Sequence, residues 1–193
     1  EVENIIPDTN SVDYDAIKME DLVSEGKVIY VDLEDTYCKH VEANFDLDAI
    51  CNSDLNFAYD AMFGAGMNAI KRLLPNATLL HCDDNPGFLG TAPEPIHRNL
   101  QEFSDLMRDN DLHCGLATDG DADRIGLYDS KGNFVDSHHI ILLLIHYLVK
   151  YKNLTGKIVT AFSCSVKVEQ LCKHYGLEQE TVKIGFKQIA GKM

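Results

Sequence analysis

The feature that most constrains the fold of this chain is the alternation of short apolar segments with amphipathic ones from Asn56 onward. The pattern predicts strands over residues 56–62, 77–82, 112–118, 124–128, 133–135, 157–160 and 180–182. It predicts helices over residues 67–74, 96–110, 137–152, 165–175 and 185–192. Strands that alternate with helices build a largely parallel sheet covered by helices. The predicted fold class is therefore α/β.

The two ends of the chain follow other patterns. Residues 1–27 are polar and irregular, and we expect a lead-in segment there with one helix near residues 14–23. A strand is then predicted over residues 27–31. Two helices are predicted over residues 33–44 and 46–51, and Asp32 is expected to cap the first of these helices. At the other end, two strands and three helices are too few for an independent sheet domain. Residues 136–193 are therefore predicted to be part of a domain.

Charge excludes some classes of partner. The 193 residues carry 17 Lys and Arg against 31 Asp and Glu, for a formal charge of −14. Proteins that bind nucleic acid or anionic membranes present basic clusters, so neither partner is expected. An anionic substrate would have to meet a few local cations, a metal ion or the N-terminus of a helix.

Cysteine usage and apolar runs indicate the compartment. The six cysteines form no CxxC pair, which argues against a zinc knuckle and favours reduced thiols in a cytoplasmic protein. The longest apolar run, residues 140–145, is far too short to span a bilayer. Because the sequence begins with Glu1 rather than Met, we expect it to be a piece of a longer protein.

The most informative polar stretch is residues 119–124, between two predicted strands. Asp119, Asp121 and Asp123 alternate with small residues, and Arg124 follows at once. Charged carboxylates a few ångströms apart repel one another by about 1 kcal/mol even in bulk water. This spacing in a tight loop can direct three oxygens at one point, as a hard divalent cation requires. A metal site is predicted here, with a solvated acidic turn as the alternative.

A calcium loop of the EF-hand type fits the stretch poorly. That motif needs glycine at its sixth position and glutamate at its twelfth. Here those positions hold Arg124 and Ser130. A positive side chain beside the metal instead favours a phosphate ligand.

A second candidate site is a glycine turn. Residues 64–69, Gly-Ala-Gly-Met-Asn-Ala, fit the dinucleotide fingerprint GxGxxG/A between a strand and a helix. Asp83 or Asp84 lies near the position that would bind the ribose. The alternative is that glycine simply suits a strand-to-helix turn. Asp60, a charged residue within the preceding strand, has no place in the dinucleotide hypothesis.

Other polar residues near predicted strand ends have simpler explanations. Ser137 precedes two histidines and is predicted to cap its helix. The hydroxyls of Thr160, Ser163 and Ser165 either cap the next helix or face a phosphate. Lys187, like Arg124, is a cation at a strand end, where ligands bind in α/β proteins.

Four ordered stretches resemble the α-D-phosphohexomutases, the family of phosphoglucomutase and phosphomannomutase. The acidic loop, residues 119–124, resembles the family's metal-binding loop. The other stretches are residues 57–66, the Ala-Pro-Glu-Pro of residues 92–95 with Asn99-Leu100, and residues 184–187. The resemblance covers residues 28–193.

The resemblance implies a fold and a site. It implies a three-layer αβα second domain with a mixed, mostly parallel sheet over residues 28–135, followed by part of a third αβα domain. Asp119, Asp121 and Asp123 would be the ligands of Mg²⁺. Arg124 and Lys187 would bind the phosphate or the sugar.

The resemblance also implies a reaction. The whole enzyme would interconvert hexose 1-phosphate and 6-phosphate, of glucose or mannose, through a phosphoserine and a hexose 1,6-bisphosphate. The phosphoserine loop would belong to another domain, so we expect this part alone to be inactive. A dinucleotide-binding domain and a non-enzymatic metal-binding module are the alternatives.

Overall fold

A computed structural model of the chain describes residue 5 and residues 16–192. Contacts divide the chain into one unit that ends at His40 and a second that begins at Val41. Helix α1 spans Met19–Ser24, so the helix expected near residues 14–23 is present in part, and residues 14 and 15 lie outside the described residues. Helix α2 spans Leu33–Asn44 and reaches into the second unit.

The segment between these helices corrects one prediction. No strand forms over residues 27–31, and Ile29, Tyr30 and Val31 are about three-quarters exposed. A strand needs a neighbour for its backbone N–H and C=O groups, and none of the described strands pairs with this segment. The predicted cap of α2 is confirmed, because the Asp32 carboxylate accepts the Asp35 N–H at 2.8 Å.

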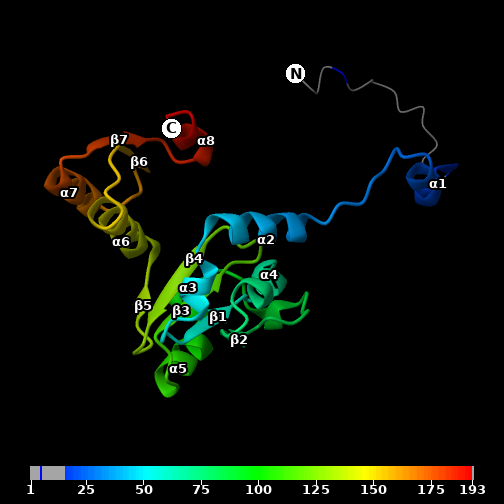
Figure 1. Cartoon of the computed structure of the whole chain (residues 1–193), viewed down its shortest axis with the longest axis horizontal. Coiled ribbons are helices and arrows are strands. Elements are labelled where there is room, and N and C mark those ends of the chain that lie inside the picture. The colour runs from blue at the N-terminus through cyan, green and yellow to red at the C-terminus, as the bar shows by residue number, and fades with distance from the viewer. Residues whose placement is uncertain (1–4, 6–15, 193) are drawn as a thin grey trace. The chain divides into compact units, whose positions relative to one another are not determined.

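The second unit contains a five-stranded sheet with the strand order β2-β1-β3-β4-β5 (Figure 1). The strands are β1 Phe57–Asp60, β2 Thr78–Leu80, β3 Cys114–Thr118, β4 Ile125–Asp129 and β5 Phe134–Val135. Strand β1 pairs in parallel with β2 and β3, whereas β3–β4 and β4–β5 are antiparallel. This confirms a mixed sheet, and it makes the acidic stretch the connection of an antiparallel hairpin.

Helices cover both faces of this sheet because side chains alternate along β1. Ala58 packs with Phe103 and Met107 of helix α5, Gln101–Asp109. Tyr59 packs with Met67 and Ile70 of helix α4, Gly66–Leu73, on the other face. The αβα layering is therefore present. The single helix predicted over residues 96–110 begins instead with a separate 3₁₀ turn, His97–Asn99, before α5.

Residues 136–192 form a smaller α/β arrangement. Its elements are α6 Ser137–Lys150, β6 Lys157–Ala161, α7 Val166–Tyr175, β7 Glu178–Val182 and α8 Phe186–Ala190. Strands β6 and β7 pair in parallel, and Ile145, Val168 and Cys172 form the local core. That this segment is part of a larger domain stays a prediction.

Caps define the helices of this segment. Asp136, not the predicted Ser137, is the N-cap of α6, since its carboxylate accepts the His139 N–H at 3.0 Å. Both residue types can cap, and Ser137 already has its backbone in the helix. The predicted cap of α7 by Ser165 is confirmed. Among the described helices, none combines the length and apolar character that a membrane crossing requires.

The Asp136 cap gives a pH-dependent prediction. The His139 N–H and the His139 ring hold the pKa of Asp136 below its usual value. The ionised cap therefore stabilises the fold above about pH 4, and this contribution is lost as the pH falls through the folded-state pKa. Asp136→Ala should lower the free energy of unfolding by about 1 kcal/mol at pH 7, with a smaller deficit at pH 3.

Urea denaturation at both pH values measures this difference. Asp136→Asn is the matched control, because an asparagine caps about as well as an aspartate at neutral pH. Equal deficits for Asp136→Ala at pH 7 and pH 3 would show that the ionised carboxylate has no such role.

Candidate metal centre

The acidic loop connects β3 to β4 and is closed by its own backbone. The Asp119 N–H donates to the Arg124 carbonyl at 3.3 Å, and the Ala122 N–H donates to the Asp119 carbonyl at 3.0 Å. Ala122 has a φ of +59°, in the left-handed region that a non-glycine residue seldom adopts. This tight turn directs every second side chain to the same side of the loop.

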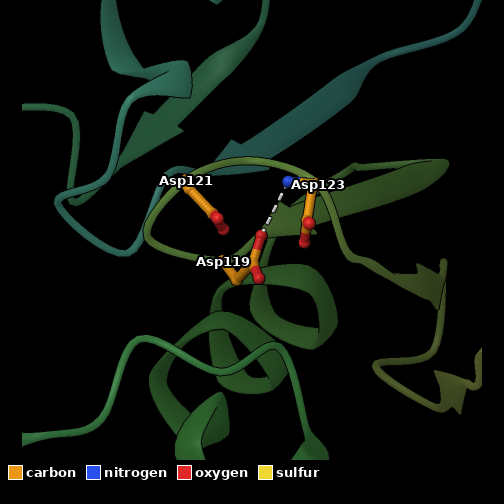
Figure 2. A group of neighbouring side chains, drawn as sticks. All are labelled: Asp119, Asp121 and Asp123. Atoms are coloured by element: carbon orange, nitrogen blue, oxygen red, sulfur yellow. Dashed lines mark hydrogen bonds between the residues drawn. The ribbon is translucent and has the colours of Figure 1, made fainter. Parts of the chain in front are cut away.

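The three carboxylates of the loop converge (Figure 2). Asp119, Asp121 and Asp123 can each offer one oxygen such that these oxygens all lie within 4.8 Å of one another. Asp119 is buried, while Asp121 and Asp123 are exposed. A group of carboxylate oxygens with one fixed and two adjustable members suits a hard divalent cation.

Arg124 and the loop backbone hold the buried carboxylate of Asp119. Its Oδ1 accepts the N–H groups of Asp123 at 2.9 Å and Arg124 at 3.0 Å, and its Oδ2 accepts Nε of Arg124 at 2.6 Å. Burial alone would raise the pKa of Asp119, but these hydrogen bonds and the guanidinium charge lower it below its usual value. Asp119 is therefore ionised and fixed in place at neutral pH.

Repulsion remains at the exposed end of the loop. The neighbouring charge of Asp121 raises the pKa of Asp123, and the charge of Asp119 adds to this effect. Like charges this close favour the neutral form of one of them. A bound cation would relieve the repulsion, so the electrostatics of the loop agree with a metal site.

Two segments that are distant in sequence contact the backbone of the acidic loop. The Ala65 N–H donates to the Gly120 carbonyl at 2.9 Å, and the Gly120 N–H donates to the Pro93 carbonyl at 3.2 Å. A Cβ on Gly64 would lie 2.7 Å from the Asp119 carbonyl oxygen and 2.8 Å from that of Gly120. Only glycine at position 64 lets the two backbones approach this closely.

The glycine turn thus has a packing role. A Cβ on Gly66 would overlap the hydroxyl of Tyr59, which is hydrogen-bonded to Thr118 Oγ1 at 2.6 Å. In a dinucleotide site the backbone of this turn would face a pyrophosphate. Here Gly64 and Ala65 face the acidic loop instead, so the turn supports the backbone of that loop.

The two predicted cations differ in their surroundings. Nε of Arg124 binds Asp119, while its Nη1 lies 3.9 Å from Glu94 Oε1 and the side chain is 61% exposed. Hydrogen bonding to Asp119 raises the pKa of Arg124. Lys187 is the second residue of α8, follows Gly185 and is exposed. The structure therefore attaches Arg124 to Asp119 of the acidic cluster, and a phosphate-binding role for Lys187 stays a prediction.

Sequence reasoning did not identify the residues that support the loop. The sequence places Gly64 in the dinucleotide fingerprint and in one family-like stretch, and Pro93 in another such stretch, but none of these patterns predicts a contact with the acidic loop. No pattern in the sequence indicates His81, whose Nδ1 lies 3.0 Å from Oδ1 of the buried Asp60. The one feature of the sequence that could have indicated this support is Asp60, a charged residue in an otherwise apolar strand.

Comparison with known proteins identifies the family. The family description "Phosphoglucomutase/phosphomannomutase, alpha/beta/alpha domain II" matches residues 35–132, and the corresponding domain III matches residues 136–193. Fold and acidic loop together define an α/β domain of sugar-phosphate mutase type. The chain belongs to the phosphoglucomutase/phosphomannomutase family.

Individual relatives agree with this assignment. A probable phosphoglucosamine mutase from Pyrococcus furiosus is 30% identical over 86% of this chain and 36% of its own length. A phosphopentomutase from Thermococcus kodakarensis is 30% identical over 69% of this chain and 30% of its own length. A Thermus thermophilus structure, described as a "putative phosphomannomutase", superposes with a TM-score of 0.74 at 29% identity, covering 81% of this chain and 37% of that one. The chain spans about a third of the length of these relatives.

The close approach at Gly64 can be tested by substitution. Gly64→Ala should displace the backbone at residues 119–120 and lower the free energy of unfolding by about 1–3 kcal/mol, because neither carbonyl oxygen can rotate away. Urea denaturation measures the loss, and the amide resonance of Gly120 reports the displacement.

The matched control is Gly87→Ala, where the nearest atom, Asn85 Oδ1, lies at 3.4 Å and φ is −88°. We expect that variant to stay within about 0.5 kcal/mol of wild type. Equal stability of both variants, with an unshifted Gly120 amide, would refute the packing role.

Proposed function

We propose that this chain supplies the metal-binding loop of a Mg²⁺-dependent mutase that moves a phosphoryl group between two positions of a sugar phosphate. The observation that carries the proposal is the convergence of Asp119, Asp121 and Asp123 beside Arg124. The net reaction would exchange the 1- and 6-phosphates of a hexose through a hexose 1,6-bisphosphate. The serine that carries the phosphoryl group would belong to another domain of the whole enzyme.

The donor set fits Mg²⁺. All three candidate donors are carboxylate oxygens, the hard ligands that Mg²⁺ prefers. Asp121 and Asp123 are exposed, so their side chains could adjust toward a cation held against the fixed carboxylate of Asp119. When bound, the ion would supply charge neutralisation to the transferring phosphoryl group.

The residues of the acidic loop would have different roles in binding the metal ion and the phosphate. Asp119 is fixed by three hydrogen bonds and would act as the rigid ligand. Asp121 and Asp123 would adjust around it. Arg124, oriented through its Nε, would offer its remaining N–H groups to phosphate oxygens, for which a guanidinium is well shaped. Lys187 would bind the phosphate or the sugar, as the family resemblance implies.

The substrate is proposed only as a class. The relatives are described as mutases of phosphoglucosamine, phosphopentose and phosphomannose. We therefore widen the expected glucose or mannose phosphate to a sugar monophosphate that includes an aminosugar. Residues 28–135 would form the metal-binding domain and residues 136–193 part of the next, in a cytoplasmic enzyme.

Titration of the chain with Mn²⁺ and Mg²⁺ by calorimetry tests the metal site. Wild type should bind weakly, because the serine ligand belongs to another domain, and Asp121→Asn should weaken binding at least about tenfold. The control is Asp54→Asn, which removes an exposed carboxylate outside the loop. An isotherm that Asp121→Asn leaves unchanged would contradict the metal assignment.

A parallel titration with NADH addresses the alternative function. We expect no saturable change in fluorescence, since the glycine turn packs on the acidic loop. Saturable micromolar binding would favour the dinucleotide hypothesis. Sugar-phosphate mutase assays on the full-length protein, with glucose, mannose and glucosamine phosphates, would then define the substrate.

A further inference from the structure

A buried carboxylate lies at the end of strand β1, which pairs with β2 on one side and β3 on the other. Asp60 is 1% exposed, and its Oδ1 accepts the Met62 N–H at 2.8 Å and contacts Nδ1 of His81 at 3.0 Å. Burial raises the pKa of Asp60, and the contacts with Met62 and His81 oppose this shift. A charged residue is rarely this buried unless it is paired, and here both partners belong to turns that leave the sheet.

His81 links the ends of two parallel strands. It follows β2 directly, and its Nε2 lies 3.4 Å from Glu102 Oε2 at the start of α5. Its ring centroid lies 4.6 Å from that of Phe63, and its carbonyl accepts the Phe63 N–H at 2.9 Å. The turn after β1 is thus attached to the turn after β2 by side-chain and backbone contacts.

The backbone at these turns is unusual. Met62, Phe63 and His81 have φ values of +47°, +59° and +48°, in the left-handed region that bulky residues avoid. Phe88 and Leu89 share this conformation, and all five residues line one cavity of about 110 Å³. Such conformations persist only where surrounding contacts enforce them, and they cluster near functional sites.

The constrained turn leads directly to the metal centre. The Gly64 N–H donates to the Ala61 carbonyl at 2.8 Å, which closes the turn. The next contacts are those of Gly64 and Ala65 with the carbonyls of Asp119 and Gly120. Any change in the turn would therefore reach the backbone that carries the first metal ligand.

We infer that Asp60 and His81 are positioning residues for the metal-binding loop. The Asp60 carboxylate holds the Met62 N–H, as aspartates do for an amide two residues ahead. His81 fixes that carboxylate from the neighbouring strand end. The turn so formed places Gly64 and Ala65 against the acidic loop. This inference rests on the proposed metal-binding function.

Mn²⁺ affinity of Asp60 variants tests the inference. Asp60→Ala removes both contacts and should weaken Mn²⁺ binding about tenfold, as loss of a supporting hydrogen bond near a metal site typically does. Asp60→Asn should stay within about threefold of wild type, because the amide oxygen at the place of Oδ1 can accept from both the Met62 N–H and Nδ1–H of His81. Should Asp60→Ala fail to fold, His81→Phe, which keeps a ring but loses the link, should also weaken binding several-fold.

Ser104→Ala separates positioning from general destabilisation. Ser104 is 4% exposed and donates to the Gly132 carbonyl at 2.8 Å, away from the acidic loop. Its loss should lower the stability to urea but leave Mn²⁺ affinity unchanged. Equal affinity of Asp60→Ala and wild type, or equal weakening by Ser104→Ala, would overturn the inference.

The amide resonance of Gly120 provides a readout without metal. It should shift in Asp60→Ala and stay in place in Asp60→Asn and Ser104→Ala. A wild type that binds no Mn²⁺ would refute the proposed function alone, because the Gly120 shift would still test the positioning role. An unshifted Gly120 in Asp60→Ala would refute the positioning role alone.

Discussion

The interaction on which the acidic loop depends is the set of hydrogen bonds to the Asp119 carboxylate. An ionised carboxylate buried without partners costs several kcal/mol, and here three N–H groups of Asp123 and Arg124 satisfy it. Two of these donors are backbone amides of the same turn, so satisfying the charge also closes the turn. The same contacts therefore bring Asp121 and Asp123 to the side of Asp119 and orient the guanidinium of Arg124.

The loop is also held from outside by segments that the sheet brings together. Gly120 donates its N–H to Pro93 and accepts the N–H of Ala65, so both of its backbone groups are bonded. The turn that contains Ala65 is in turn held by the buried Asp60 and by His81. A site whose ligands are placed before a cation arrives needs less reorganisation on binding. The hydrogen bonds to Pro93 and Ala65 thus hold the backbone of the acidic loop at Gly120.

Features of the fold that depend on neighbouring residues in the sequence could be predicted. Features that depend on contacts between distant segments could not. The acidic turn between two strands was predictable, because a short run of mostly apolar and small residues lies on each side of it. The strand predicted over residues 27–31 was wrong, since an apolar run becomes a strand only beside a partner. The role of Gly64 could not be predicted, because its neighbour Gly120 lies far along the chain. His81 meets Asp60 only after β1 and β2 pair.

Charge explains why the site has this composition. In the part of the loop described above, three carboxylates and Arg124 leave a net charge of −2 within a chain of net charge −14. A phosphate dianion would be repelled by such a surface at distances up to about a Debye length, roughly 8 Å at physiological salt. In the proposed enzyme one divalent cation would bring the cluster to neutrality, and the guanidinium could then act on the phosphate without opposition. In the proposed function the acidic loop and the arginine beside it would therefore act together, the carboxylates on a cation and the guanidinium on an anion.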